Sequence, residues 1–118
     1  NIDYVYAHGT ATILGDQVEL NAIMRIFNDQ SIFVSSTKSS IGHLLGAAGA
    51  IETIATILSV KNNIVPPTIN HFTDDPEINQ ALNYTFNKAQ EREVRSAISN
   101  TFGFGGHNAS VLFKKHAQ

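Results

Sequence analysis

The chain has 118 residues, of which 42% are hydrophobic, and this length and apolar content predict a single folded domain. Eight basic and ten acidic residues give a net charge of -2 with no long block of either sign, which argues against a nucleic-acid partner. The sequence contains no cysteine, and this excludes disulfides, thiolate metal sites and a cysteine nucleophile within the chain.

The chain opens on a strand-like segment rather than on a secretion signal. Residues 2–7 are mostly apolar and follow no basic segment, so we expect a strand, and a chain cut out of something longer. A helix is predicted next, with Asp16 as its N-cap, Glu19 three residues later and apolar side chains at helical spacing beyond. Residues 31–35 then predict a second, buried strand.

Residues 41–60 are almost continuously apolar and predict a long helix that is buried on most sides. Their length also meets the crude criterion for a membrane span. His43 and Glu52 lie inside the segment, however, and ionisable groups are costly within a membrane. We therefore expect a core helix and no membrane contact.

The remainder predicts a long connection followed by three strands. Residues 61–83 carry several turn-forming residues and form the connection, and residues 84–86 form a brief strand. Residues 94–99 and 109–114 predict a hairpin around a glycine-rich loop. The expected order is β-α-β-α-β-β-β, an α/β fold with a mixed five-stranded sheet whose first strands pair in parallel.

Three polar loops, each attached to a hydrophobic element, are the candidate functional parts. They are AHGT at 7–10, STKSSIGH at 36–43 and NTFGFGGHN at 100–108. Enzymes of the α/β class assemble their sites from such loops, so we expect the three to meet.

These motifs, together with LLGAAGA at 44–50, occur in a recognisable order. With them the chain resembles the β-ketoacyl-acyl carrier protein synthases, most closely the type II condensing enzymes of bacterial dissociated fatty-acid synthesis. The resemblance covers residues 1–118 as the later part of the C-terminal half of a thiolase-like fold. It implies an acyltransferase that elongates acyl chains in fatty-acid biosynthesis.

The implied reaction is a decarboxylative Claisen condensation. Malonyl-acyl carrier protein loses carbon dioxide, and the resulting enolate attacks an acyl thioester held on a cysteine. That cysteine belongs to the N-terminal half of the family's fold, so this chain alone is expected to be inactive. The resemblance further implies acyl carrier protein as partner, a homodimer, a cytoplasmic location and no cofactor of its own, since phosphopantetheine arrives on the carrier.

The resemblance also assigns roles in decarboxylation. His8 and His43 donate hydrogen bonds to the malonyl thioester oxygen, and Lys38 orders the groups around them. Physical reasoning adds that a helix beginning at His43 would favour a neutral imidazole there. Glu52 is implied to pair with Lys38, but an unbroken helix would place Glu52 opposite His43, so the pairing requires an approach from behind or a distorted first turn.

The remaining roles concern substrate binding. Thr10 and Thr12 match the hydroxyls that bind the phosphopantetheine arm, although threonines after a strand commonly bond only their own backbone. Phe104 matches a gate whose backbone N–H contributes to an oxyanion hole, and Asn108 is expected to anchor its loop. Some relatives hold a structural cation near Glu52, but Tyr6 stands where they carry asparagine, so we predict no metal.

Other classes of function fit less well. A metal hydrolase would need closely spaced ligands, whereas the histidines lie far apart in the sequence. A nucleotide loop at 102–106 lacks a following helix pattern and a phosphate-binding Lys-Ser/Thr. A ketosynthase domain of a polyketide system, or a non-catalytic synthase-like partner subunit, stays open as the alternative within the same fold.

Overall fold

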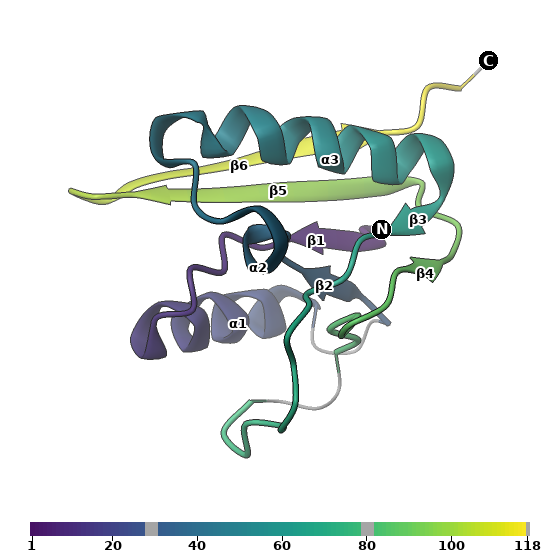
Figure 1. Ribbon diagram of the computed structural model, residues 1–118. Coiled ribbons are helices and arrows are strands. Elements are labelled where there is room, and N and C mark those ends of the chain that lie inside the picture. Colours follow the sequence, from purple (N-terminus) through teal and green to yellow (C-terminus); the bar gives the residue numbers. More distant parts are fainter. Residues whose placement is uncertain (28–30, 79–81, 118) are drawn as a thin grey trace.

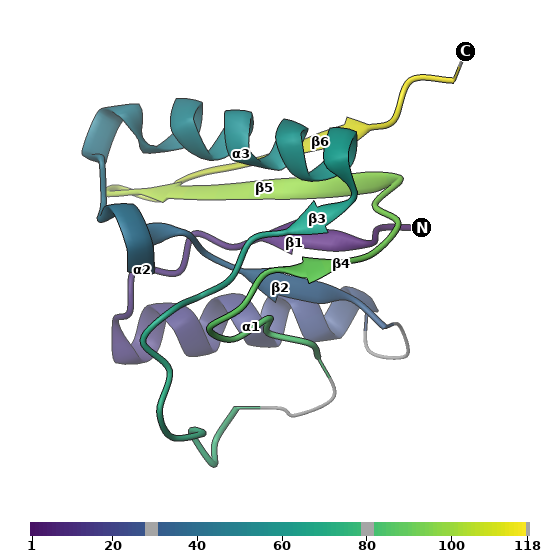
Figure 2. The same ribbon diagram turned by 45° about the vertical axis from the view of Figure 1, so that its right-hand side comes forward.

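A mixed sheet lies between two helices in the computed structural model, which describes residues 1–27, 31–78 and 82–117 (Figure 1). Helix α3 covers one face of the sheet and α1 the other in both views (Figures 1 and 2). The strand order is β2-β1-β5-β6, with β1 parallel to β2 and β5, and β5 antiparallel to β6. The predicted α/β class, the parallel first pair and the closing hairpin are therefore confirmed. The elements are α1 (Ile13–Phe27), α3 (Ala48–Asn62), β1 (Tyr4–Tyr6), β2 (Phe33–Ser35), β5 (Ser96–Gly103) and β6 (His107–Lys114).

The core lies on both faces of the sheet because successive side chains of a strand point to opposite sides. Tyr4 and Tyr6 of β1 pack in one cluster that includes Val60 of α3. Val5, between them, packs in the other cluster with Ile23 of α1. Strand β1 is fully buried and supplies both halves of the core.

Helix α1 begins earlier than predicted, and Asp16 is not its N-cap. The helix starts at Ile13, and the amide of Asp16 already donates to the carbonyl of Thr12 at 3.1 Å. The Asp16 carboxylate instead accepts the amide N–H of Ala11 at 3.1 Å. The N-cap prediction is wrong because this carboxylate turns back to the loop that precedes the helix.

The prediction of one helix over residues 41–60 is wrong, and three separate elements lie within residues 38–62 instead. A single turn, α2 (Lys38–Ile41), is followed by a 3₁₀ turn, η1 (Leu45–Ala47), and only then by α3. The break is at Gly42, whose φ of 78° and ψ of -177° are conformations that essentially only glycine adopts. No helix in the described part of the chain has the length and apolarity needed to cross a membrane.

The predicted strand at residues 84–86 is also wrong, so the main sheet has four strands instead of five. Asn83 makes an isolated bridge to β2, and Phe86 makes another to Thr68. Between and after these bridges, Thr85 and Asn87 have φ angles of 50° and 65°, which interrupt an extended chain. A separate two-stranded antiparallel sheet joins β3 (Ile64–Val65) to β4 (Gln90–Glu91).

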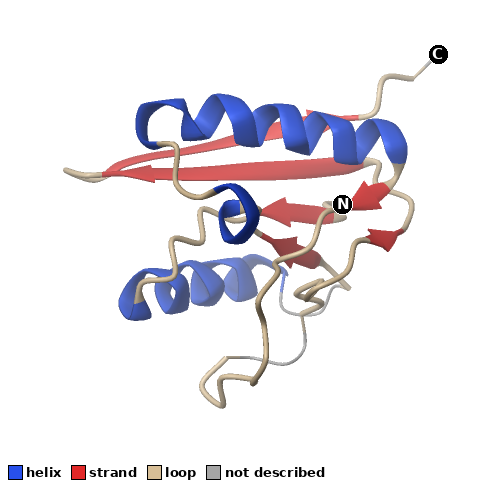
Figure 3. Cartoon of the chain, viewed as in Figure 1, coloured by secondary structure: helices blue, strands red, loops and turns tan. Residues whose placement is uncertain are grey.

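The candidate loops emerge at one end of the main sheet. Strands β1 and β2 are parallel neighbours, so the loops that follow them leave the same edge. Figure 3 shows the loop that follows β1 in tan, whereas the segment that follows β2 leads almost at once into the short blue helix α2. The topology thus brings together segments that lie far apart in the sequence.

Candidate active site

The rings of His8 and His43 lie against each other at this edge. Their centroids are 5.6 Å apart and their planes are nearly perpendicular, at 89°. The ring of Phe102, from the glycine-rich hairpin, lies 5.3 Å from that of His8. All three predicted loops therefore meet at one place.

His8 is held in one protonation state by its neighbours. The ammonium of Lys38 lies 3.5 Å from Nδ1 of His8, and an ammonium can only donate, so Nδ1 is the acceptor. Burial, Lys38 and His43 together lower the pKa of His8 to about 4. At neutral pH the ring is therefore uncharged, with its proton on Nε2.

His43 has the same tautomer for a different reason. Its Nδ1 accepts the amide N–H of Leu45 at 3.0 Å, which leaves the proton of the neutral ring on Nε2. The prediction that a helix begins at His43 is wrong, because Gly42 breaks the chain and α3 starts only at Ala48. Within the described residues, no hydrogen bond occupies Nε2 of either ring, so both are available as donors.

Lys38 forms a buried ion pair with Glu52. The ammonium is hydrogen-bonded to Oε1 of Glu52, and the two side chains are only 6% and 2% exposed. The break at Gly42 allows this contact, since α2 and α3 are no longer one helix. The pairing that the resemblance implied is therefore present, and Lys38 stands between Glu52 and His8.

Sequence reasoning missed the role of Glu19 at the site. Its carboxylate is buried and accepts the backbone N–H groups of His8 and Gly9 at 2.9 and 3.1 Å, and the amide of Asn100 at 3.3 Å. Burial raises the pKa of Glu19, and these hydrogen bonds oppose the rise. The sequence offered one signal, because Glu19 lies one helical turn before the core residue Ile23 and so on the same face of the helix. Interpreting Glu19 as part of a helix cap left this signal unused.

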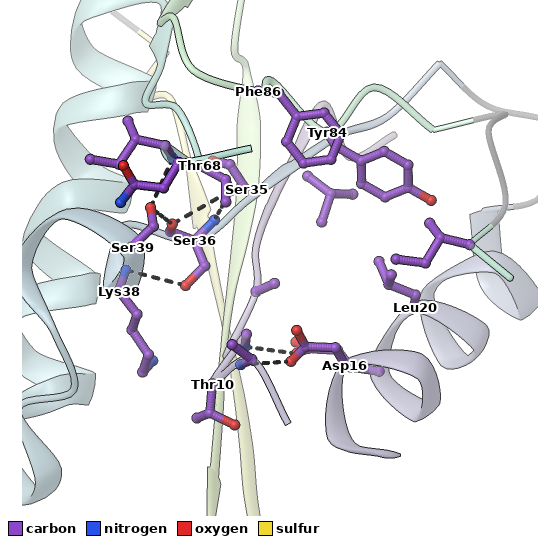
Figure 4. Close-up of a pocket in the computed structure, with 18 of the residues that line it drawn as sticks. Thr10, Asp16, Leu20, Ser35, Ser36, Lys38, Ser39, Thr68, Tyr84 and Phe86 are labelled. Carbon is purple, nitrogen blue, oxygen red and sulfur yellow. Dashed lines mark hydrogen bonds between the residues drawn. The ribbon is translucent and has the colours of Figure 1, made fainter. Parts of the chain in front are cut away.

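A cavity of about 460 Å³ opens beside the segments that follow β1 and β2 (Figure 4). Lys38 and His43 line it, and Figure 4 shows Lys38 across from Thr10 and Asp16. Aromatic and aliphatic side chains, including Tyr84 and Phe86, form another part of its wall. The cavity thus joins polar donors to an apolar wall.

Three predicted residues do not line the cavity that His43 lines. Thr12 and Asn108 line a different, larger cavity of about 900 Å³ between α1 and the β5–β6 hairpin. Phe104 is fully exposed at the tip of that hairpin, and it is Phe102 whose ring lies against His8. Of the two threonines, only Thr10 shares a cavity with His43.

The side chains of Tyr6 and Asn100 are engaged by protein partners. The hydroxyl of Tyr6 is bonded to Thr37, and the amide of Asn100 is bonded to Glu19 and Ser110. One oxygen of Glu52 is buried without a partner, but one free oxygen makes no coordination shell. No cluster of three His, Cys, Asp or Glu side chains suited to a metal occurs in the described ranges.

Comparison with known proteins identifies the family of this arrangement. Residues 1–72 match the family model described as "Beta-ketoacyl synthase, C-terminal domain". Over 98% of its length the chain is 47% identical to the 3-oxoacyl-[acyl-carrier-protein] synthase 2 of Rhizobium meliloti (strain 1021), of which it covers 27%. It also superposes on a β-ketoacyl synthase from Burkholderia phymatum STM815 with a TM-score of 0.90 and 40% identity, covering 98% of this chain and 28% of that one.

A third similar structure is the complex AntDE:AntF, a type II polyketide synthase acyl-carrier protein with its ketosynthase. The TM-score is 0.89 at 34% identity, over 96% of this chain and 28% of that one. Fold and motifs therefore place the chain in the ketosynthase class of folds. The chain belongs to the β-ketoacyl synthase family and carries its C-terminal domain, spanning about a quarter of the relatives it matches.

Proposed function

We propose that the chain, residues 1–118, is the C-terminal part of a 3-oxoacyl-[acyl-carrier-protein] synthase of fatty-acid biosynthesis. The full-length protein would condense malonyl-acyl carrier protein with an acyl-enzyme thioester and elongate the acyl chain by two carbons. The observation that carries this proposal is the meeting of His8 and His43, each with Nδ1 engaged and its proton on Nε2. The 47% identity to a synthase of that name supports it.

The histidines would act on the thioester oxygen as carbon dioxide leaves. Two N–H donors aimed at a developing negative charge stabilise the transition state, and losing one such donor typically costs on the order of 10²–10³ in rate. A neutral imidazole donates a hydrogen bond but is too weak an acid to transfer its proton to the enolate. The pKa of about 4 keeps His8 neutral, and the Lys38–Glu52 pair fixes the ammonium that contributes to this value.

The substrate-binding roles are part of the same proposal. Thr10 and Thr12 would bind the phosphopantetheine arm, Phe104 would gate the acyl channel, and Asn108 would anchor its loop. The partner would be acyl carrier protein, and the complex of a related ketosynthase with its acyl-carrier protein supports this choice. We further propose a cytoplasmic homodimer that uses no metal and no resident cofactor.

A polyketide ketosynthase is the second candidate. The structural likeness to a polyketide ketosynthase at 34% identity favours it, but the 47% identity to a fatty-acid synthase is higher. A non-catalytic partner subunit would have no need of two donor histidines in contact. Both observations favour the fatty-acid reaction.

The test is the variant His43→Ala in the full-length protein. We expect acyl transfer to the cysteine at the parental rate, and malonyl decarboxylation reduced on the order of 10²–10³-fold because one donor is lost. His116→Ala, a change near the exposed C-terminal end, is the matched control and should decarboxylate normally. Decarboxylation at the parental rate in His43→Ala would refute the assignment, as would condensation by residues 1–118 alone.

A further inference from the structure

The segment that precedes and includes Lys38 is held by hydrogen bonds from two sides. From β1, the hydroxyl of Tyr4 bonds to that of Ser35 at 2.9 Å. From the connection after α3, the hydroxyl of Thr68 accepts the amide N–H of Ser36 at 3.0 Å. The residue directly before Lys38 is Thr37, and its partner is Tyr6.

Tyr6 contacts Thr37 at two atoms. Its hydroxyl oxygen accepts the backbone N–H of Thr37 at 3.2 Å and is also hydrogen-bonded to the Thr37 hydroxyl. Tyr6 itself is fully buried in β1, two residues before His8. The Tyr6 hydroxyl thus joins β1, the strand that leads into the His8 loop, to the residue next to Lys38.

The position of Thr37 indicates that this contact replaces a local one. Thr37 is the N-cap residue of α2, where a threonine hydroxyl normally accepts a backbone N–H of the first helical turn. Here the hydroxyl makes no such cap and is bonded to Tyr6. Thr37 therefore bonds to β1, the strand before the His8 loop, instead of capping its own helix.

We propose that Tyr6 is a positioning residue, whose hydroxyl fixes Thr37 and thereby sets the Lys38 ammonium against His8. This inference rests on the proposed function of His8 and Lys38. Tyr6 lies outside the family motifs from which the site residues were predicted, so the inference adds a new residue to the proposed site. Tyr6 touches neither histidine ring through its hydroxyl and acts through the loop.

The consequence is electrostatic. His8 is faced by the ammonium of Lys38, by the ring of His43 and, through its backbone N–H, by the carboxylate of Glu19. Burial and Lys38 are the two largest causes of its low pKa. Glu52 holds the ammonium directly, and Tyr6 holds the backbone from which the Lys38 side chain extends. Without the Tyr6 hydroxyl that backbone is held by fewer bonds, so the ammonium is expected to lie farther from Nδ1 and the pKa of His8 to rise toward its ordinary value.

The experiment compares Tyr6→Phe with the parent in the full-length protein. Loss of one hydrogen bond that orients a charge is expected to lower kcat for malonyl decarboxylation by up to about tenfold with little change in KM. The acid limb of the pH profile should move to higher pH, together with the His8 titration followed by NMR of labelled histidine. The control is Ser59→Ala, which removes a buried hydroxyl bonded within α3 to the carbonyl of Ala55. It should leave both the pH profile and the His8 titration unchanged.

A second pair of variants covers the case in which Tyr6→Phe does not fold. Thr37→Val removes the hydroxyl that bonds to Tyr6 and should shift the pH profile of decarboxylation to higher pH, as Tyr6→Phe does. Thr37→Ser keeps a hydroxyl at this position and should show the parental pH profile. An unshifted His8 titration in Tyr6→Phe or Thr37→Val would overturn the inference. If Lys38→Ala and His43→Ala also decarboxylate normally, the proposed function itself fails; if they are impaired, only the role of Tyr6 is rejected.

Discussion

Two buried carboxylates hold the histidine loops, and they use different kinds of partner. Glu19 accepts three N–H groups, two of them from the backbone around His8. Glu52 has the ammonium of Lys38 and leaves one oxygen unpartnered. Removing one member of a buried ion pair typically costs about 3–5 kcal/mol, so Lys38 and Glu52 stabilise the site only as a pair.

The low pKa of His8 links stability to pH. Below its ordinary value of 6.5 the unfolded chain protonates His8, whereas the folded protein keeps the ring neutral down to about pH 4. The unfolded state then binds more protons, so stability is expected to fall as the pH drops through this window. We expect the full-length parent to lose more unfolding free energy between pH 7 and pH 5 than His8→Gln does. An equal loss in both proteins, measured by urea denaturation, would contradict a lowered pKa.

The break between α2 and α3 decides where His43 lies. Gly42 turns the chain so that Lys38 reaches Glu52 and the amide of Leu45 reaches the imidazole. The apolar run over residues 41–60 concealed this turn, because its periodicity fits one helix and a single glycine is tolerated inside helices. The interruption becomes visible only when tertiary contacts favour two short elements over one long one.

Substitution of Gly42 tests this element directly. A Cβ at Gly42 would meet no atom within 4 Å, so Gly42→Ala isolates the strain of its backbone angles. We expect a loss of about 1–3 kcal/mol in the free energy of unfolding of the full-length protein. Gly46→Ala is the control, because it has equal space and no positive φ, and it should change stability little. Equal effects of the two substitutions would show that the angles at Gly42 are not required.

Other elements differ in how far the sequence could reveal them. The β5–β6 hairpin was predictable, since two apolar runs flank a glycine-rich turn. The contact of His8 with His43 was expected from the ends of adjacent parallel strands. The structure of residues 84–86 and the role of Glu19 were not predictable, because left-handed angles at Thr85 and a carboxylate turned toward a loop leave no periodic signal.

At the scale of the whole molecule, both helices present apolar side chains to solvent. On α1 these include Ile13, 94% exposed, and Leu14, 72% exposed. On α3 the isoleucines at 51, 54 and 57 are 38–55% exposed and lie on the side of the helix away from the sheet core. So many exposed large apolar side chains are uncommon on a monomer in water.

Residues 1–118 expressed alone are therefore expected to self-associate. Light scattering coupled to size-exclusion chromatography should give a mass that rises with protein concentration. The variant Ile54→Lys places a charge in the α3 surface and should reduce this association, whereas Ser40→Lys, at an exposed site on α2, should not. A monodisperse monomer at high concentration would contradict the expectation.

The shared tautomer of the two imidazoles makes them separable by chemistry at a single atom. In each ring one nitrogen is engaged by the protein, through Lys38 or through the amide of Leu45, and the other is unoccupied among the described groups. A histidine analogue methylated on Nε2, the unoccupied nitrogen, would keep the hydrogen bond at Nδ1 but could no longer donate to the substrate. The same methyl on Nδ1 would break the hydrogen bond that orients the ring. The two isomers would therefore separate the effect of the Nε2 donor from the effect of ring position.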